Sequence, residues 1–199
     1  MFKDTATMIL ELADYASPHS KLTRMVESGR WIRVRRGLYL DTEAPEVSPL
    51  SLAGILYGPS YVSFEYALAA HGLIPEKVQT ITCASFRKNK HKVFDTPIGR
   101  FTYSCVPEKA YPLAVTLGGE GASGFLIATP EKALCDQLYT LGGVSSRRQL
   151  TRLLFEDLRL ERSDLLQLDR QVILTLAPLY RRASLAIFSQ WLTREAADA

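Results

Sequence analysis

The sequence predicts an α+β fold, in which a short N-terminal unit precedes a larger mixed unit that ends in several helices. Apolar residues recur at helical spacing in some segments and alternate in others, without the regular strand–helix alternation of a parallel sheet. Apolar residues make up 47% and charged residues 23% of the 199-residue chain, as is typical of a folded globular protein. The chain is therefore long and apolar enough to bury a sizeable core.

Two helices open the predicted N-terminal unit. Residues 4–16 place apolar side chains at helical spacing, and Asp4 is a suitable N-cap. Residues 19–28 form the second helix, and Gly29 stands where a glycine commonly ends a helix. A Ser-Pro pair separates the two helices.

A two-stranded hairpin follows these helices. Residues 31–35 alternate between apolar and basic side chains, as in a half-buried strand. One side is expected to carry the aliphatic residues and the other the arginines, namely Ile32 and Val34 against Arg33 and Arg35. Arg36 and Gly37 then form a tight turn into a second short strand, residues 38–40.

A linker is predicted at residues 43–49, which contain two prolines, two acids and a serine without apolar periodicity. The chain is therefore expected to divide into an N-terminal unit of residues 1–42 and a larger unit of residues 50–199.

The larger unit is expected to begin with helices at residues 50–57 and 64–71, the second capped by Ser63. Segments rich in β-branched and aromatic residues follow, with a hairpin turn at residues 96–99; these strands are expected at 78–86, 93–95, 100–106 and 124–128. Thr129 then caps a helix that ends near Leu141. Three helical segments complete the chain: Ser145 or Ser146 through Leu158, Ser163 through Leu176, and Ala183 to Arg194.

The net charge of +3 conceals two basic segments. Residues 18–37 carry a local net charge of +5 and residues 87–92 carry +4, which leaves −6 for the remainder. Positive charge concentrated in this way on an acidic body is typical of a protein that binds a polyanion.

Candidate nucleic-acid-binding residues lie in the first basic segment. Polar residues near the start of the second helix lie largely off its apolar face, where a recognition helix directs them at base edges and phosphates of a major groove. These residues are Ser20, Lys21, Thr23 and Arg24. The basic residues of the hairpin are suited to phosphates and to the minor groove: Arg30, Arg33, Arg35 and Arg36. The alternative is a solvated charged surface, but cations placed off the apolar faces of adjacent elements favour nucleic acid.

The second basic segment has two interpretations. Arg87, Lys88, Lys90 and Lys92 lie between two strand-like segments, as in a solvated hairpin tip. Alternatively, they supply a second nucleic-acid patch, in which each phosphate neutralised would steepen the salt dependence of binding.

No catalytic or metal centre is expected. Cys83, Cys105 and Cys135 lack a metal-binding spacing and are expected to be reduced, buried thiols. The glycine-rich stretch 118–124 lacks the Lys-Ser/Thr of a phosphate loop and precedes a strand. No close pair of acids in a strand context is available for Mg²⁺. The sequence therefore predicts a protein that is not an enzyme and has no cofactor.

A cytoplasmic protein without membrane association is also expected. The apolar stretches are far shorter than the ~20 residues of a membrane span. The N-terminus lacks the charged-then-apolar pattern of a signal peptide.

The segment from Ser20 to Tyr39 resembles the N-terminal winged helix of the AbiEi family, the antitoxin and repressor component of AbiE-type (type IV) toxin–antitoxin pairs. Two later segments continue this resemblance: residues 61–75, YVSFEYALAAHGLIP, and residues 128–136, ATPEKALCD. One feature departs from the pattern. A full winged helix has three helices before the wing, whereas this sequence has room for two. Either the helix-turn-helix is abbreviated or the first helix serves another purpose.

The resemblance implies a DNA-binding repressor that regulates its own operon and antagonises a nucleotidyltransferase toxin encoded beside it, in many members without a stable complex. It also implies double-stranded DNA from its own promoter as a partner. If the operator contains inverted repeats, a homodimer on DNA is expected. The C-terminal helices either provide that dimer contact or pack within their own domain, through Leu179, Ile187, Phe188 and Trp191.

Two rival functions remain open at this point. One is a nuclease or nucleotidyltransferase that holds nucleic acid on its basic segments. The other is a protein-interaction module that neutralises a toxin by direct contact through residues 50–199.

Overall fold

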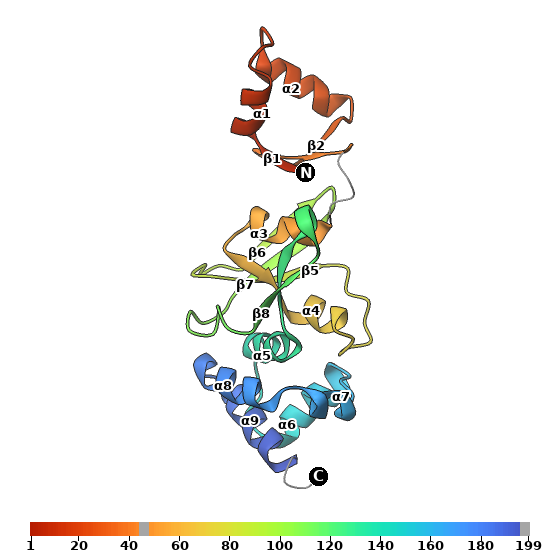
Figure 1. Cartoon of the computed structure of the whole chain (residues 1–199). Helices are drawn as coiled ribbons and strands as arrows, with labels where there is room; N and C mark the ends of the chain where they lie inside the picture. Colours follow the sequence, from red (N-terminus) through yellow and green to blue (C-terminus); the bar gives the residue numbers. More distant parts are fainter. Residues whose placement is uncertain (44–47, 196–199) are drawn as a thin grey trace.

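The computed structural model describes residues 1–43 and 48–195, and it confirms the predicted α+β fold (Figure 1). We call residues 1–43 the head and residues 48–195 the body. The head lies at one end of the molecule, and the C-terminal helices lie at the other (Figure 1). Most of the predicted linker, residues 44–47, lies outside the described residues.

The head contains two helices and a three-stranded antiparallel sheet of order β1-β3-β2. Its elements are β1 (Phe2–Asp4), α1 (Thr5–Glu11), α2 (Pro18–Glu27), β2 (Trp31–Arg35) and β3 (Leu38–Asp41). The two predicted helices and the hairpin are confirmed, although α1 ends five residues earlier than residue 16. Strand β1 is an element that the sequence did not predict.

Local signals in the sequence explain the boundaries of the head's helices. The Asp4 carboxylate accepts a hydrogen bond from the Thr7 amide at 2.8 Å, so it caps α1 as predicted. Gly29 follows α2 with a φ of +75°, a conformation that glycine adopts without strain. A small core joins the helices to one side of the sheet and consists of Met8, Leu12, Leu22, Trp31 and Tyr39.

Strand β2 contains a bulge that the predicted alternation misses. Arg33 lies opposite Tyr39, but Arg35 lies opposite Leu38, because Val34 is inserted as an extra residue between them. Tyr39 belongs to the head's own core, whereas Val34 and Leu38 pack with the core of the body. The prediction that Arg33 and Arg35 share one side of the strand is therefore wrong. Arg33 lies on the helix-covered side of the sheet, and Arg35 lies on the side that faces the body.

A mixed six-stranded sheet of order β6-β7-β5-β4-β9-β8 forms the centre of the body. Its strands are β4 (Ser60–Val62), β5 (Ile81–Ser85), β6 (Lys92–Thr96), β7 (Gly99–Cys105), β8 (Val115–Gly118) and β9 (Phe125–Ala128). The predicted hairpin at residues 96–99 joins β6 to β7. Strands β4 and β8 were not predicted.

Helices α5, α8 and α9 connect the sheet to the end of the body. Helix α4 packs on α5, α5 on α8, and α8 on α9 (Figure 1). The helices of the body are α3 (Leu52–Leu56) after the 3-10 turn η1 (Pro49–Ser51), α4 (Phe64–Ala70), α5 (Pro130–Thr140), α6 (Arg147–Arg152), α7 (Arg162–Gln167), α8 (Arg170–Tyr180) and α9 (Ala183–Glu195). A short 3-10 turn, η2 (Gly121–Ser123), precedes β9, and a π-helical segment, η3 (Leu153–Asp157), follows α6.

The apolar residues of the C-terminal helices pack within the body. Phe188 and Trp191 are buried, and Leu179 and Ile187 pack against the same cluster. Of the two roles considered for these residues, packing in their own domain is the one observed. Within residues 1–43 and 48–195, every helix is too short or too polar to cross a membrane.

A buried polar network joins α5 to the sheet and to α8. Lys132 and Asp136 lie one helical turn apart and are both fully buried, with 3.2 Å between the ammonium nitrogen and a carboxylate oxygen. The carboxylate also accepts hydrogen bonds from Tyr61 at 2.9 Å and Ser63 at 2.7 Å, and from Tyr180. Ser63 therefore does not cap α4 as predicted, because its hydroxyl is directed at Asp136.

This network and the buried thiols predict that the protein loses stability at alkaline pH. Burial raises the pKa of several acidic groups above their usual range, and these are Tyr61, Tyr103, Tyr180, Cys83 and Cys135. Burial also raises the pKa of Tyr111 to about 12. These groups stay protonated in the folded protein but lose protons in the unfolded chain between about pH 8 and 10. The folded state then binds more protons, so the free energy of unfolding falls as the pH rises.

The test is the urea midpoint of unfolding at pH 8 and pH 10.5. Burial also raises the pKa of Tyr66. Lys132 acts in the opposite sense, because burial lowers the pKa of its ammonium, but this one group is opposed by seven. A midpoint that is lower at pH 10.5 is expected; a constant or higher midpoint would contradict this assignment.

Candidate nucleic-acid interface

Helix α2 presents the first group of predicted residues at the surface of the head. Arg24 is exposed, and none of the ion pairs within the described residues includes it. Thr23 is exposed too, and its hydroxyl donates to the His19 carbonyl at 3.1 Å. The Ser20 hydroxyl accepts from Ser17 at 2.9 Å. Arg24 is thus the residue of this group with the greatest capacity to form new contacts.

Lys21 is more constrained than the other residues of this group. It is half-buried, and its ammonium lies 4.7 Å from the centre of the Tyr15 ring. An ammonium held over an aromatic face is attracted by the ring's negative quadrupole. The contact fixes the position of Lys21 beside the start of α2, and Tyr15 was not identified from the sequence.

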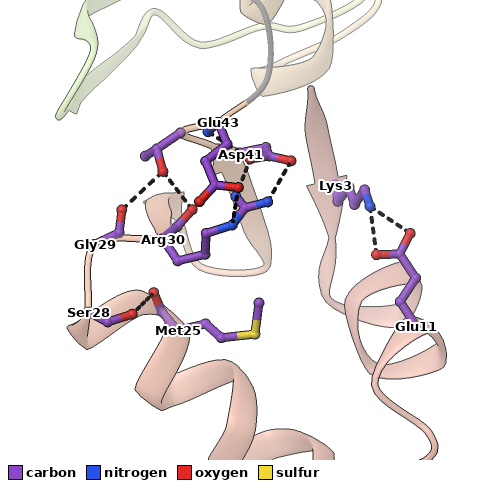
Figure 2. Close-up of polar contacts among 9 residues, drawn as sticks. Lys3, Glu11, Met25, Ser28, Gly29, Arg30, Asp41 and Glu43 are labelled. Carbon is purple, nitrogen blue, oxygen red and sulfur yellow. Dashed lines mark hydrogen bonds and ion pairs between the residues drawn. The ribbon is translucent and has the colours of Figure 1, made fainter.

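Arg30 is engaged at the base of the hairpin. Its guanidinium pairs with Asp41 and with Glu43, the latter at 3.1 Å (Figure 2). The hydrogen bond between the Arg30 and Asp41 side chains raises the pKa of Arg30 and lowers the pKa of the Asp41 carboxyl. These contacts tie the start of β2 to the end of β3. The predicted phosphate contact of Arg30 thus competes with an existing ion pair.

A second ion pair in the head was not predicted from the sequence. The Lys3 ammonium lies 2.6 Å from Glu11 and joins β1 to the end of α1 (Figure 2). It also lies 5.3 Å from the centre of the Trp31 ring. Lys3 therefore orders the sheet against the helix, and its charge is balanced within the head.

The hairpin of β2 and β3, which we call the wing, carries exposed cations on two sides. Arg33, Arg35 and Arg36 are exposed, and no ion pair within residues 1–43 and 48–195 includes them. Arg36 occupies the turn between β2 and β3, which Gly37 closes with a φ of +81°. Arg36 therefore presents its charge at the tip of the wing and Arg33 on the helix-covered side, whereas Arg35 lies on the side toward the body, where its charge acts on Tyr103.

The second basic segment connects β5 to β6. Arg87 is paired with Glu108 at 2.8 Å, and the Lys88 ammonium lies 5.2 Å from the centre of the Tyr57 ring. Lys90 and Lys92 are exposed, and within the described parts of the chain no ion pair includes them. Arg87 and Lys88 are therefore already in contact with other residues of the body. Lys90 and Lys92 carry their charges at the exposed surface.

The described residues contain no cluster of three or more His, Cys, Asp or Glu side chains that is arranged to hold a metal ion. The three cysteines are free thiols, and Cys83 and Cys135 are buried as predicted, whereas Cys105 is half-buried.

Comparison with known protein families gives a match in the head. Residues 9–40 match the family model described as a transcriptional regulator, AbiEi antitoxin. No curated protein matches the chain. The matched residues include α2, β2 and most of β3, and all eight predicted DNA-binding residues of the head lie within the matched range. The later segments of resemblance, residues 61–75 and 128–136, lie outside the match and stay predictions. Over residues 9–40, this chain therefore matches the AbiEi antitoxin family of transcriptional regulators, and the resemblance predicted from its sequence is confirmed for that segment.

Proposed function

We propose that this protein is a transcriptional repressor that binds DNA through its head, regulates its own operon, and acts as the antitoxin of a toxin–antitoxin pair. The observation that carries the proposal is a set of exposed cations, unpaired within the described residues, on a head that matches a family of regulators: Arg24, Arg33 and Arg36. In this proposal α2 enters the major groove, and the wing contacts phosphates and the adjacent minor groove.

The proposed partners follow from the same family description. Double-stranded DNA from the promoter of the protein's own operon is the proposed ligand, and a nucleotidyltransferase encoded beside it is the proposed toxin. If the operator contains inverted repeats, two heads address half-sites about 34 Å apart, or a multiple of that distance. We propose no enzymatic activity and a cytoplasmic location.

Repression in cells tests the proposal as a whole. The DNA upstream of the gene is fused to a reporter, and the full chain is supplied from a second promoter. The wild type is expected to lower the expression of the reporter. The variant Lys21→Ala/Arg24→Ala is expected to leave the reporter at its unrepressed level. Growth rescue on co-expression with the neighbouring nucleotidyltransferase is expected as well. Rescue of growth without any repression would replace the proposal with an antitoxin that acts by protein contact.

Arg24→Ala is expected to reduce the selectivity of binding. A good bidentate contact to a base edge discriminates by about 1–3 kcal/mol, so the preference for upstream over scrambled DNA should fall about tenfold. Arg33→Ala is the matched comparison, because loss of a phosphate contact weakens binding to both DNAs equally. Fluorescence-anisotropy competition between the two DNAs measures the preference. Equal losses on both DNAs for both variants would contradict this division of roles.

A further inference from the structure

A pocket of about 440 Å³ opens on the side of the body sheet that α4 and α5 cover. Its volume is within the range of small-molecule sites. The floor is formed by β5 and β7, which run in parallel with Thr82 opposite Thr102 and Ala84 opposite Ser104. The pocket belongs entirely to the body, so it is separate from the proposed DNA-binding surface.

One wall of the pocket consists of two oxygen-bearing side chains. The Gln137 amide donates to the Glu65 carboxylate at 2.6 Å and joins α5 to α4. Gln137 is only 2% exposed, and its amide oxygen has no hydrogen-bond partner among the described residues. A buried acceptor without a donor is unfavourable. A ligand that brings N–H groups to this wall would supply the missing donor, after a small rotation of the amide.

The backbone is strained at the same wall. Phe64 lines the pocket and has a φ of +56°, in the left-handed region that bulky residues rarely adopt. The preceding residue is held in place, because the Ser63 hydroxyl donates to the buried Asp136 carboxylate. Strain of this kind persists only where the surroundings impose it, and it is concentrated at binding sites. The wall is therefore fixed in position before any ligand binds.

The lining also includes a residue of the basic segment 87–92. His91 lines the pocket, and its neighbour Lys90 is exposed, whereas Lys92 pairs with Tyr103 and so lies on the face of the sheet away from Thr102 and Ser104. The field of this segment attracts an anion and repels a cation such as a guanidinium. A ligand suited to both ends carries N–H donors at one end and an anionic group at the other.

We propose that this pocket binds a nucleotide whose base carries an amino group, with the base edge against Glu65 and Gln137 and the phosphate toward Lys90. An amino-bearing base provides the N–H donors that the wall lacks. Both a free nucleotide and an unpaired nucleotide of a single strand have this chemistry. The inference goes beyond repression and does not depend on it.

Isothermal titration of the full chain tests this inference with adenosine, guanosine, cytidine and uridine 5′-monophosphates. At least one amino-bearing nucleotide is expected to bind at least tenfold more tightly than uridine monophosphate, whose base lacks an amino group. Its nucleoside, without the phosphate, is expected to bind more weakly. No saturable binding at millimolar concentration, or equal binding of all four nucleotides, would overturn the proposal. Tighter binding of arginine amide than of any nucleotide would also overturn it.

Substitutions locate the site. Glu65→Gln preserves size but removes a charged acceptor, and at least a tenfold loss of affinity is expected. Glu120→Gln, at an exposed carboxylate outside the pocket, is the control and should have no effect. Lys90→Gln should weaken binding of the nucleotide but not of its nucleoside. Equal affinities for wild type and Glu65→Gln, with both proteins folded by thermal unfolding, would overturn the assignment.

Two further arms identify the source of the ligand and separate this inference from repression. The first arm compares the affinities of a short single-stranded RNA and of the mononucleotide for the Glu65-dependent site. Tighter binding of the RNA would identify a nucleic-acid strand as the ligand, and tighter binding of the mononucleotide would identify a free nucleotide. The head variant Arg33→Ala/Arg36→Ala should retain nucleotide binding, because the pocket lies in the body. Loss of nucleotide binding in that variant would contradict a separate site.

Discussion

Replacing Asp136 with alanine is expected to lower the free energy of unfolding by about 3–5 kcal/mol. The Asp136 carboxylate is fully buried, pairs with Lys132, and accepts hydrogen bonds from Tyr61, Ser63 and Tyr180. Its removal leaves an ammonium buried without its counter-charge and hydroxyls without their acceptor. Both losses act on the folded state, since the unfolded chain solvates these groups with water.

Urea unfolding followed by circular dichroism measures this loss. Asp95→Ala is the matched control, because that carboxylate is 75% exposed in its pair with Arg100, and an exposed pair contributes about 1 kcal/mol or less. The double variant Lys132→Met/Asp136→Leu should lose less stability than Asp136→Ala, because no unpaired charge remains. A loss for Asp136→Ala no larger than that of Asp95→Ala would show that the network does not stabilise the fold.

The double variant Arg33→Ala/Arg36→Ala is expected to bind upstream DNA at least about 100-fold more weakly than the wild type at low salt, since each charge-assisted contact contributes about 1.5–3 kcal/mol. Both guanidinium groups are exposed and unpaired within the described residues, so their removal leaves the head's own ion pairs intact. The slope of log affinity against log salt concentration should become shallower by about two, because two phosphates are no longer neutralised.

Two single variants control this result. Arg152→Ala removes an exposed cation from α6, at the end of the body farthest from the head (Figure 1), and should leave DNA binding unchanged. Arg35→Ala should cost less affinity than Arg33→Ala, because the bulge places Arg35 on the side toward the body. Equal losses for Arg152→Ala and the head variant would mean that binding depends on total charge rather than on the wing.

Much of the head could be predicted from the sequence because its boundaries are local. The Asp4 cap, the glycine after α2 and the Arg36-Gly37 turn depend on residues within a few positions of one another. Strand β1 could not be predicted, because it has three residues and pairs with β3 about 35 positions later in the chain. The bulge in β2 was missed for a related reason. An extra residue in one strand is recognised only from the pairing with the neighbouring strand, here β3.

The body shows the same distinction between local and distant contacts. Thr129 and Pro130 begin α5 as predicted. The predicted helix from Ser163 through Leu176 is two helices, because Leu168 is extended and Asp169 caps α8. The role of Ser63 depends on Asp136, 73 positions away. The spacing of four between Lys132 and Asp136 was the local signal of the buried network. The burial that makes this pair matter for stability depends on residues far away in the chain, so the local sequence does not show it.

The most direct test of the central claim is a fluorescence-anisotropy titration of the full chain against its own upstream DNA and a scrambled duplex, at two salt concentrations. The proposal predicts tight binding to the upstream DNA, weaker binding to the scrambled duplex, and a loss of affinity at higher salt. It also predicts that Arg33→Ala/Arg36→Ala abolishes most of the binding. Equally weak binding to both duplexes, unchanged by the substitutions, would contradict a DNA-binding head.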